Sequence, residues 1–144
     1  KYYEIFYKAE GLPKTSVVNL KSDFTEWGPR QYGLHLDLLY HACKKAGARL
    51  IIIKQPRLVS GLNGKEERMK ISYQMVGLSH EALIRAFEAC DSEIDKVAQA
   101  YPDVVVIDAA SLMNGRSEFF QDHVHLTELG SRQLALIVAR KIEL

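Results

Sequence analysis

Two residues near the end of the chain have the types and spacing that acid–base chemistry requires. Asp122 and His125 stand three positions apart, between the apolar run 103–107 and the last segment with helical periodicity. A turn with this spacing can place a carboxylate beside an imidazole. The carboxylate then fixes the tautomer of the ring and compensates the charge that the ring gains on taking a proton. The pair therefore predicts a general base, His125, oriented by an acid, Asp122.

Other uses of these side chains compete with that interpretation. An Asp or His beside a helix start is commonly a cap or a solvated surface group. His123 and His125 alternate along the segment, and with Asp108 or Asp122 they offer metal ligands, but an isolated His-x-His is a weak signal. We therefore expect no metal ion and no other cofactor, and we expect the His123 side chain to point to solvent.

The elements that must position this pair alternate along the chain. Apolar residues at the 3.6-residue period predict three helices, over residues 30–46, 79–100 and 127–142. Two continuous apolar runs, 49–54 and 103–107, are typical of strands that are buried on both faces.

Several single residues refine this pattern. The hydroxyl groups of Ser79 and Thr127 suit the first position of the second and third helices. Gly130 is expected to let the last helix pack closely on its neighbour. Cys43 and Cys90 lie on apolar helical stripes and are predicted to be buried free thiols. Residues 57–78 are predicted to form a long polar surface loop.

Alternating helices and buried strands form a parallel sheet with helices on its faces. Sites in such α/β folds lie past the carboxyl ends of the strands, where Asp122 and His125 fall. Two strands are too few for a stable sheet, because open apolar edges pair with further strands. We therefore expect residues 1–144 to be one domain that is the C-terminal portion of a larger domain. The alternative is a compact fold that uses residues 1–28 as extra strands.

Composition excludes some partners. The net charge is +1, with 26% charged residues and no dense run of Lys or Arg, so we expect no nucleic-acid partner. No apolar stretch is long enough to predict a membrane span. His35, His41 and His80 lack acidic partners at useful spacing, and we assign them no role. Trp27 and Tyr32 are expected to be packed in the interior rather than to line a substrate groove.

The order of these motifs resembles the C-terminal half of the SGNH (GDSL) hydrolase family, over roughly residues 24–143. The most specific piece is Asp-x-x-His-Leu-Thr-x-x-Gly at 122–130, which follows a strand ending in Val-Val-x-Asp; Gln-Pro after the first strand is weaker. The resemblance implies a flavodoxin-like three-layer α/β/α sandwich of about five parallel strands, here without its N-terminal strands. It also implies that Asp122 and His125 are the acid and base of a Ser-His-Asp triad.

The chain departs from the family in the blocks that carry the nucleophile. Family members place the serine in a Gly-Asp-Ser block and use a Gly and the Asn of Gly-x-Asn-Asp as oxyanion donors. Ser22 has no preceding strand, and Ser60 follows the wrong one. The triplet from Gly61 to Asn63 resembles the Asn block by letters only, since it comes too late and lacks the final Asp.

The expected function is therefore that of a serine ester hydrolase whose nucleophile lies outside this chain. The serine would come from a missing N-terminal half or from a partner chain, and the substrate would be an acyl or acetyl ester of a small molecule or a glycan. The alternative is a catalytically silent binding module of the same fold, which recognises a glycan or a protein partner.

Overall fold

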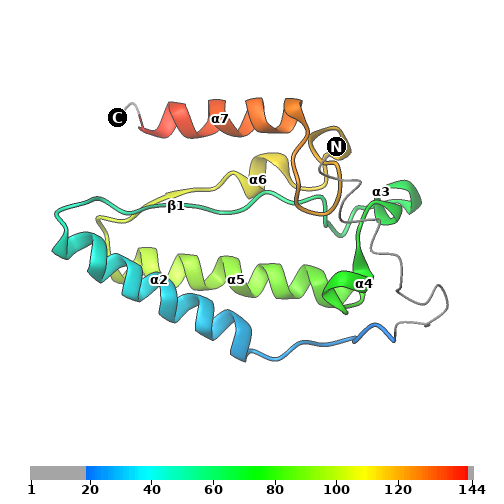
Figure 1. Ribbon diagram of the computed structural model, residues 1–144, viewed down its shortest axis with the longest axis horizontal. Helices are drawn as coiled ribbons and strands as arrows, with labels where there is room; N and C mark the ends of the chain where they lie inside the picture. The colour runs from blue at the N-terminus through cyan, green and yellow to red at the C-terminus, as the bar shows by residue number, and fades with distance from the viewer. Residues whose placement is uncertain (1–18, 143–144) are drawn as a thin grey trace, which may run out of the picture.

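The computed structural model describes residues 19–142, and expectations for residues 1–18 lie outside this range. The described part is a mixed α/β structure whose helices and two strands alternate along the chain (Figure 1). In chain order the elements are α2 (Trp27–Lys45), β1 (Ile51–Ile53), α3 (Lys65–Met69), α4 (Tyr73–Val76), α5 (His80–Ala100), β2 (Val105–Ile107), α6 (Ala110–Met113), the 3-10 turn η1 (Ser117–Phe119) and α7 (Glu128–Ile142).

The two predicted strands are adjacent and parallel, which confirms the sequence prediction. Each has three residues, and Ile52 lies opposite Val106. The ladder continues at both ends, where Val105 N–H donates to the Leu50 carbonyl at 3.2 Å and Lys54 N–H donates to the Ile107 carbonyl at 3.0 Å. Pairing stops there because the chain turns at the Gln-Pro step after β1.

The three long predicted helices are present with small shifts at their ends. Gly47 adopts a left-handed φ of 68° just after α2, a conformation that a residue without Cβ takes at no steric cost. The Ser79 hydroxyl accepts a hydrogen bond from the Ala82 N–H at 3.2 Å, so it caps α5 as predicted.

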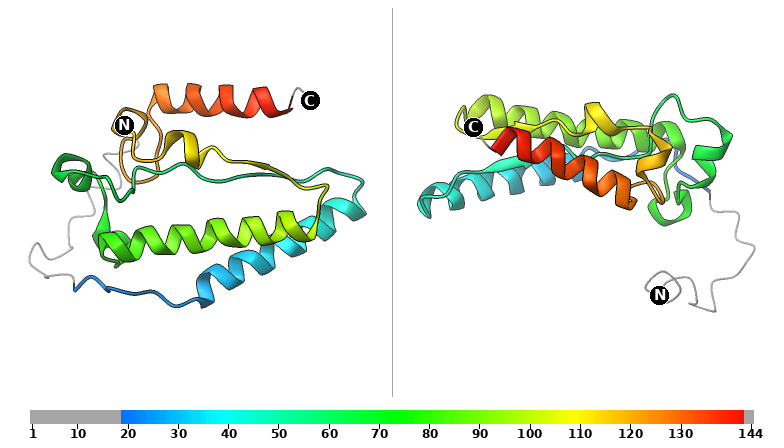
Figure 2. Two further views of the ribbon diagram at one scale, coloured as in Figure 1. Left: turned by 180° about the vertical axis from the view of Figure 1, so that it is seen from behind. Right: turned by 90° about the horizontal axis from the view of Figure 1, so that it is seen from above.

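Helices lie on both sides of the strands. In Figures 1 and 2, α2 and α5 lie on one side of β1 and β2, and α7 lies on the other. The core forms two clusters. One, which includes Leu36, Ile52 and Ile94, joins the strands to α2 and α5. The other includes Leu83 of α5 and Ile137 of α7 on the two sides of Ile107, and it extends to the carboxyl ends of the strands. None of the helices within residues 19–142 is both long and apolar enough to cross a membrane.

The prediction of a polar surface loop over residues 57–78 is wrong. The segment contains the short helices α3 and α4, and Leu58, Val59 and Ile71 are buried in the main core cluster. Helices of five and four residues are too short to show a helical period in the sequence. These apolar side chains are buried because the segment crosses the end of the sheet.

The predicted burial of four side chains is also wrong. Trp27 is 70% exposed, Tyr32 is exposed, and Cys43 and Cys90 are only half-buried. Partial burial raises the pKa of the Cys90 thiol. The stripes on α2 suggested burial, but within the described residues the outer face of that helix is left uncovered.

Gly130 packs against backbone, as the sequence predicts. It is buried in the first turn of α7, and a Cβ built on it would overlap the carbonyl group of Phe119. Because backbone cannot move aside as a flexible side chain can, any larger residue must displace either α7 or η1.

We expect Gly130→Ala to lower the free energy of unfolding by roughly 1–3 kcal/mol, the usual range for overpacking. The matched control is Gly28→Ala in the first turn of α2, where an added Cβ meets no atom within 4 Å. The control should be neutral or stabilising, since Ala favours helix over Gly by up to about 1 kcal/mol. Equal denaturant midpoints for wild type and Gly130→Ala would contradict this packing.

Candidate active site

The candidate site is the turn from Asp122 to His125, at the carboxyl end of the strands. The backbone N–H of Leu58, in the segment that follows β1, donates to the carbonyl of His123 at 3.0 Å. The Gln121 N–H donates to the His125 carbonyl at 2.8 Å and closes the turn. In Figure 1 this loop precedes α7 and lies toward the end of the molecule that also carries α3 and α4.

Asp122 and His125 are in direct contact, as their spacing predicts. The Nδ1 atom of His125 lies 2.7 Å from Asp122 Oδ2. The other carboxylate oxygen, Oδ1, accepts the backbone N–H groups of Val124 at 2.9 Å and His125 at 2.8 Å. One carboxylate therefore holds both the shape of the turn and the orientation of the ring.

The charge on Asp122 follows from these contacts. Its side chain is 18% exposed, and that burial by itself raises the pKa of the carboxyl. Hydrogen bonds from the backbone of His125 and Val124, together with the His125 ring, outweigh burial and bring the pKa below its ordinary value. Asp122 is thus ionised at neutral pH.

The His125 ring is set up for proton transfer at its far nitrogen. Its side chain is 68% exposed, whereas the carboxylate behind it is mostly buried. A neutral imidazole that donates from Nδ1 to a carboxylate carries its acceptor lone pair on Nε2. This is the arrangement that a general base requires.

Both ends of the turn are anchored in the fold. Phe120 is fully buried just before it. After it, the Thr127 hydroxyl accepts the Gly130 N–H at 3.1 Å and donates to the Glu118 carbonyl at 2.8 Å. The predicted cap at Thr127 is confirmed, and it also ties the start of α7 to η1.

A buried arginine, Arg57, holds the segment that contacts the candidate site. The sequence alone does not predict this role. The Arg57 side chain is 7% exposed, and its Nη2 lies 2.8 Å from Asp91 Oδ2 on α5. Its guanidinium lies 4.8 Å from the centre of the Phe87 ring. Arg57 directly precedes Leu58, whose N–H donates to the His123 carbonyl. The ion pair with Asp91 therefore anchors this segment to α5.

The same segment is also tied to the loop after β2. The Arg57 N–H donates to Asn114 Oδ1 at 2.9 Å, and its carbonyl accepts the Gly115 N–H at 3.0 Å. A single Arg after a proline carries no periodic signal, so the sequence offered no basis for predicting these contacts. They depend on α5 and the 114–115 loop meeting at the end of the sheet.

His123 does not point to solvent as predicted. Its side chain is only 12% exposed, and its Nδ1 lies 3.9 Å from Asp122 Oδ1. The simple alternation expected of an extended segment fails here because Asp122 bends the chain into a closed turn. The described residues contain no group of three His, Cys, Asp or Glu side chains placed to hold a metal ion.

Two of the remaining histidines, His80 and His41, have structural contacts. His80 is buried, with Nδ1 2.8 Å from the Tyr73 hydroxyl and Nε2 3.0 Å from the Ser60 carbonyl. The expectation that His41 lacks an acidic partner is wrong, since its Nε2 lies 3.9 Å from Asp37 Oδ2, one helical turn earlier.

The triplet that resembles an oxyanion block by letters has a local structural role. Asn63 is buried; its amide donates to the Leu58 carbonyl at 3.0 Å and accepts the Ser60 N–H at 2.7 Å. The Ser60 hydroxyl accepts the Leu62 N–H at 3.2 Å. These bonds close the loop on itself, as expected for a chance match.

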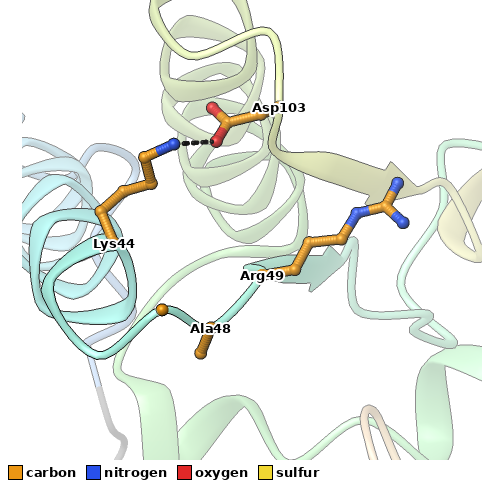
Figure 3. Close-up of a pocket in the computed structure, with 5 residues that line it drawn as sticks. Lys44, Ala48, Arg49 and Asp103 are labelled. Carbon is orange, nitrogen blue, oxygen red and sulfur yellow. Dashed lines mark hydrogen bonds and ion pairs between the residues drawn. The ribbon is translucent and has the colours of Figure 1, made fainter.

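A surface hollow of about 280 Å³ lies at the opposite end of the sheet, lined by Lys44, Gly47, Ala48, Arg49 and Asp103 (Figure 3). Lys44 Nζ and Asp103 Oδ2 lie 2.8 Å apart across it. These residues flank the amino ends of the strands. The hollow is therefore remote from the Asp122–His125 pair.

Comparison of the chain with protein-family models, with curated proteins and with solved structures gives no match.

The lowered pKa of Asp122 predicts a specific pH dependence of stability. A depressed carboxyl pKa stabilises the fold above the unfolded-state value, and this stabilisation is lost as the pH falls through the folded-state value. Wild type should therefore be more stable than Asp122→Asn at neutral pH, and the gap should close below about pH 4. Urea unfolding of both proteins over a pH series measures this difference in the free energy of unfolding.

The control for that series is Glu88→Gln, which removes an exposed carboxylate in the middle of α5. Its unfolding free energy should run parallel to that of wild type across the series. A gap for Asp122→Asn that is constant down to strongly acidic pH would show that the contacts of Asp122 do not depend on its charge.

Proposed function

We propose that this chain supplies the acid and the base of a serine ester hydrolase of SGNH type, with Asp122 as the acid and His125 as the base. The observation that carries the proposal is the 2.7 Å contact between an ionised, mostly buried carboxylate and Nδ1 of an exposed imidazole. Its position at the carboxyl end of parallel strands supports the proposal, since ligands of open α/β sheets bind there.

The chemistry of such a pair is acyl transfer. A serine hydroxyl is a poor nucleophile at neutral pH and needs a base within hydrogen-bond reach. His125 takes the serine proton as the oxygen attacks the ester carbonyl, and gives it to the leaving alcohol as the carbon–oxygen bond breaks. Water then repeats the cycle and releases the acid. Asp122 holds the Nδ1–H throughout and stabilises the imidazolium.

The serine and the oxyanion donors are proposed to come from outside this chain, from an upstream half or a partner chain. One edge of β1 has no strand partner among residues 19–142, which supports this origin. The backbones of Leu50 and Lys54 hydrogen-bond to β2. Because the backbone groups of successive residues in a strand point to opposite edges, the N–H and C=O groups of Ile51 and Ile53 point to the other edge of β1. Ile53 is also 38% exposed. An open apolar edge of this kind pairs with a further strand.

Uncovered apolar side chains on both layers of helices support the same inference. Leu34 and Leu38 are exposed on α2, and Leu129 and Leu136 are exposed on α7. Helices that cover a longer sheet would bury these faces. The finer fold that we propose is therefore a flavodoxin-like three-layer α/β/α sandwich, in which this chain is the C-terminal portion.

The second candidate function is a catalytically silent binding module of the same fold. The observation that favours it is the lack of a Gly-Asp-Ser block anywhere in the 144 residues. Such a module would use the carboxyl end of the sheet to recognise a glycan or a protein partner. It would not hydrolyse an ester.

The decisive variant is His125→Ala in the full-length protein or complex that carries the serine. Loss of the base should reduce turnover of p-nitrophenyl acetate by roughly three or more powers of ten. The control is His35→Ala on the exposed side of α2, which should retain wild-type turnover. Wild-type turnover in His125→Ala would contradict the assignment, and an inactive wild type that a fluorophosphonate leaves unlabelled would favour the silent module.

Residues 1–144 expressed alone should not hydrolyse p-nitrophenyl acetate and should aggregate or oligomerise, because the nucleophile is absent and the edge of β1 is open. Esterase assay and light scattering measure the two properties. A monodisperse monomer that turns over the ester, and loses that activity on His125→Ala, would place the nucleophile within these residues.

A further inference from the structure

The buried face of His123 holds a polar atom without a hydrogen-bond partner in the described structure. This atom is Nδ1, on a side chain that is 12% exposed. It lies 3.9 Å from Oδ1 of Asp122, close enough for electrostatic contact and too far for a hydrogen bond. Buried polar atoms in folded proteins nearly always have partners, so this atom calls for a physical explanation.

The charge on Asp122 decides which nitrogen of His123 carries the proton. A neutral imidazole has one N–H and one lone pair. With the proton on Nε2, the lone pair on Nδ1 would face the ionised carboxylate and be repelled. With the proton on Nδ1, an N–H dipole points its positive end at the carboxylate and is attracted. The second tautomer has the lower energy beside a negative charge.

The hydrogen bonds that Asp122 Oδ1 already accepts explain why Nδ1 of His123 stays 3.9 Å away from it. This oxygen already accepts the N–H groups of Val124 and His125, and an ionised carboxylate has about two lone-pair positions on each oxygen. A third donor therefore approaches Oδ1 without reaching hydrogen-bond distance.

We propose that His123 is a second imidazole in electrostatic contact with the Asp122 carboxylate. Its ring keeps the proton on Nδ1, so that the carboxylate lies between the rings of His123 and His125. It is a positioning residue, because it acts on the acid and does not touch the reacting atoms. The inference deepens the proposed function of the same site.

The backbone of His123 holds the ring in this place. The Leu58 N–H binds the His123 carbonyl at 3.0 Å, and Arg57 ties that segment to α5 through Asp91. The two backbone donors hold Oδ1 in place, and Nδ1 of His123 lies 3.9 Å from that same oxygen.

The direct test is the tautomer of His123 in the full-length protein with 15N-labelled histidine. Imidazole nitrogen shifts distinguish the two neutral tautomers. We expect the neutral form of the His123 ring to carry its proton on Nδ1 and its lone pair on Nε2. A protonated Nε2 with a bare Nδ1 would overturn the proposal, whatever the behaviour of any variant.

A matched pair of variants tests the effect on Asp122. His123→Asn keeps an amide donor close to the position of Nδ1, whereas His123→Gln moves it toward the position of Nε2. The carboxyl of Asp122, followed by 13C NMR, should titrate as in wild type in His123→Asn and at higher pH in His123→Gln. Identical titrations in wild type and His123→Gln, or the reverse order of the two variants, would overturn the proposal.

These readouts separate this inference from the proposed function. The tautomer and the titration of Asp122 are measured without substrate, so they stand if no serine is ever labelled and no ester is hydrolysed. If either variant fails to fold, as judged by circular dichroism, the tautomer of the wild-type ring still decides.

Discussion

The ionised carboxylate of Asp122 is the group on which the local structure depends. It accepts two backbone N–H groups on one oxygen and the His125 ring on the other. Each of these bonds is strong because the acceptor carries a charge and is largely withdrawn from water. These bonds favour the ionised form of the carboxyl and orient the imidazole, so the shape of the turn and the orientation of the ring have one cause.

The frame around the turn consists of contacts that are far apart in the sequence. Arg57 and Asp91 form a mostly buried ion pair that fixes the segment after β1, and that segment binds the His123 carbonyl through Leu58. On the other side, Gly130 lets α7 approach the backbone of Phe119. Packing on both sides therefore holds the turn rigidly, as the proposed general base would require.

Under the proposed function, the exposed side of the fold and the external origin of the serine have one explanation. Within residues 19–142 the sheet consists of β1 and β2 alone, so each strand has one edge without a strand partner, and at the edge of β1 the side chain of Ile53 is 38% exposed. Strands added there would extend the sheet past the Asp122–His125 turn. Their carboxyl ends would then emerge beside His125, where the proposed nucleophile is needed.

Much of the fold and the central pair of the site could be predicted from the sequence, because both depend on local patterns. Apolar runs and helical periods predicted β1, β2 and the three long helices, and the three-residue spacing predicted the contact of Asp122 with His125. Capping by Thr127 and the close packing at Gly130 were also visible from residue type and position.

Only the tertiary structure decided the features that depend on which distant segments meet. The 57–78 segment was read as a surface loop because its helices are too short to show a period, yet it crosses the sheet end and buries Ile71. Arg57 finds Asp91 across 34 positions of chain, and the His123 carbonyl accepts the N–H of Leu58 from the segment after β1. Trp27 lies exposed because an apolar stripe predicts burial only if another element covers it.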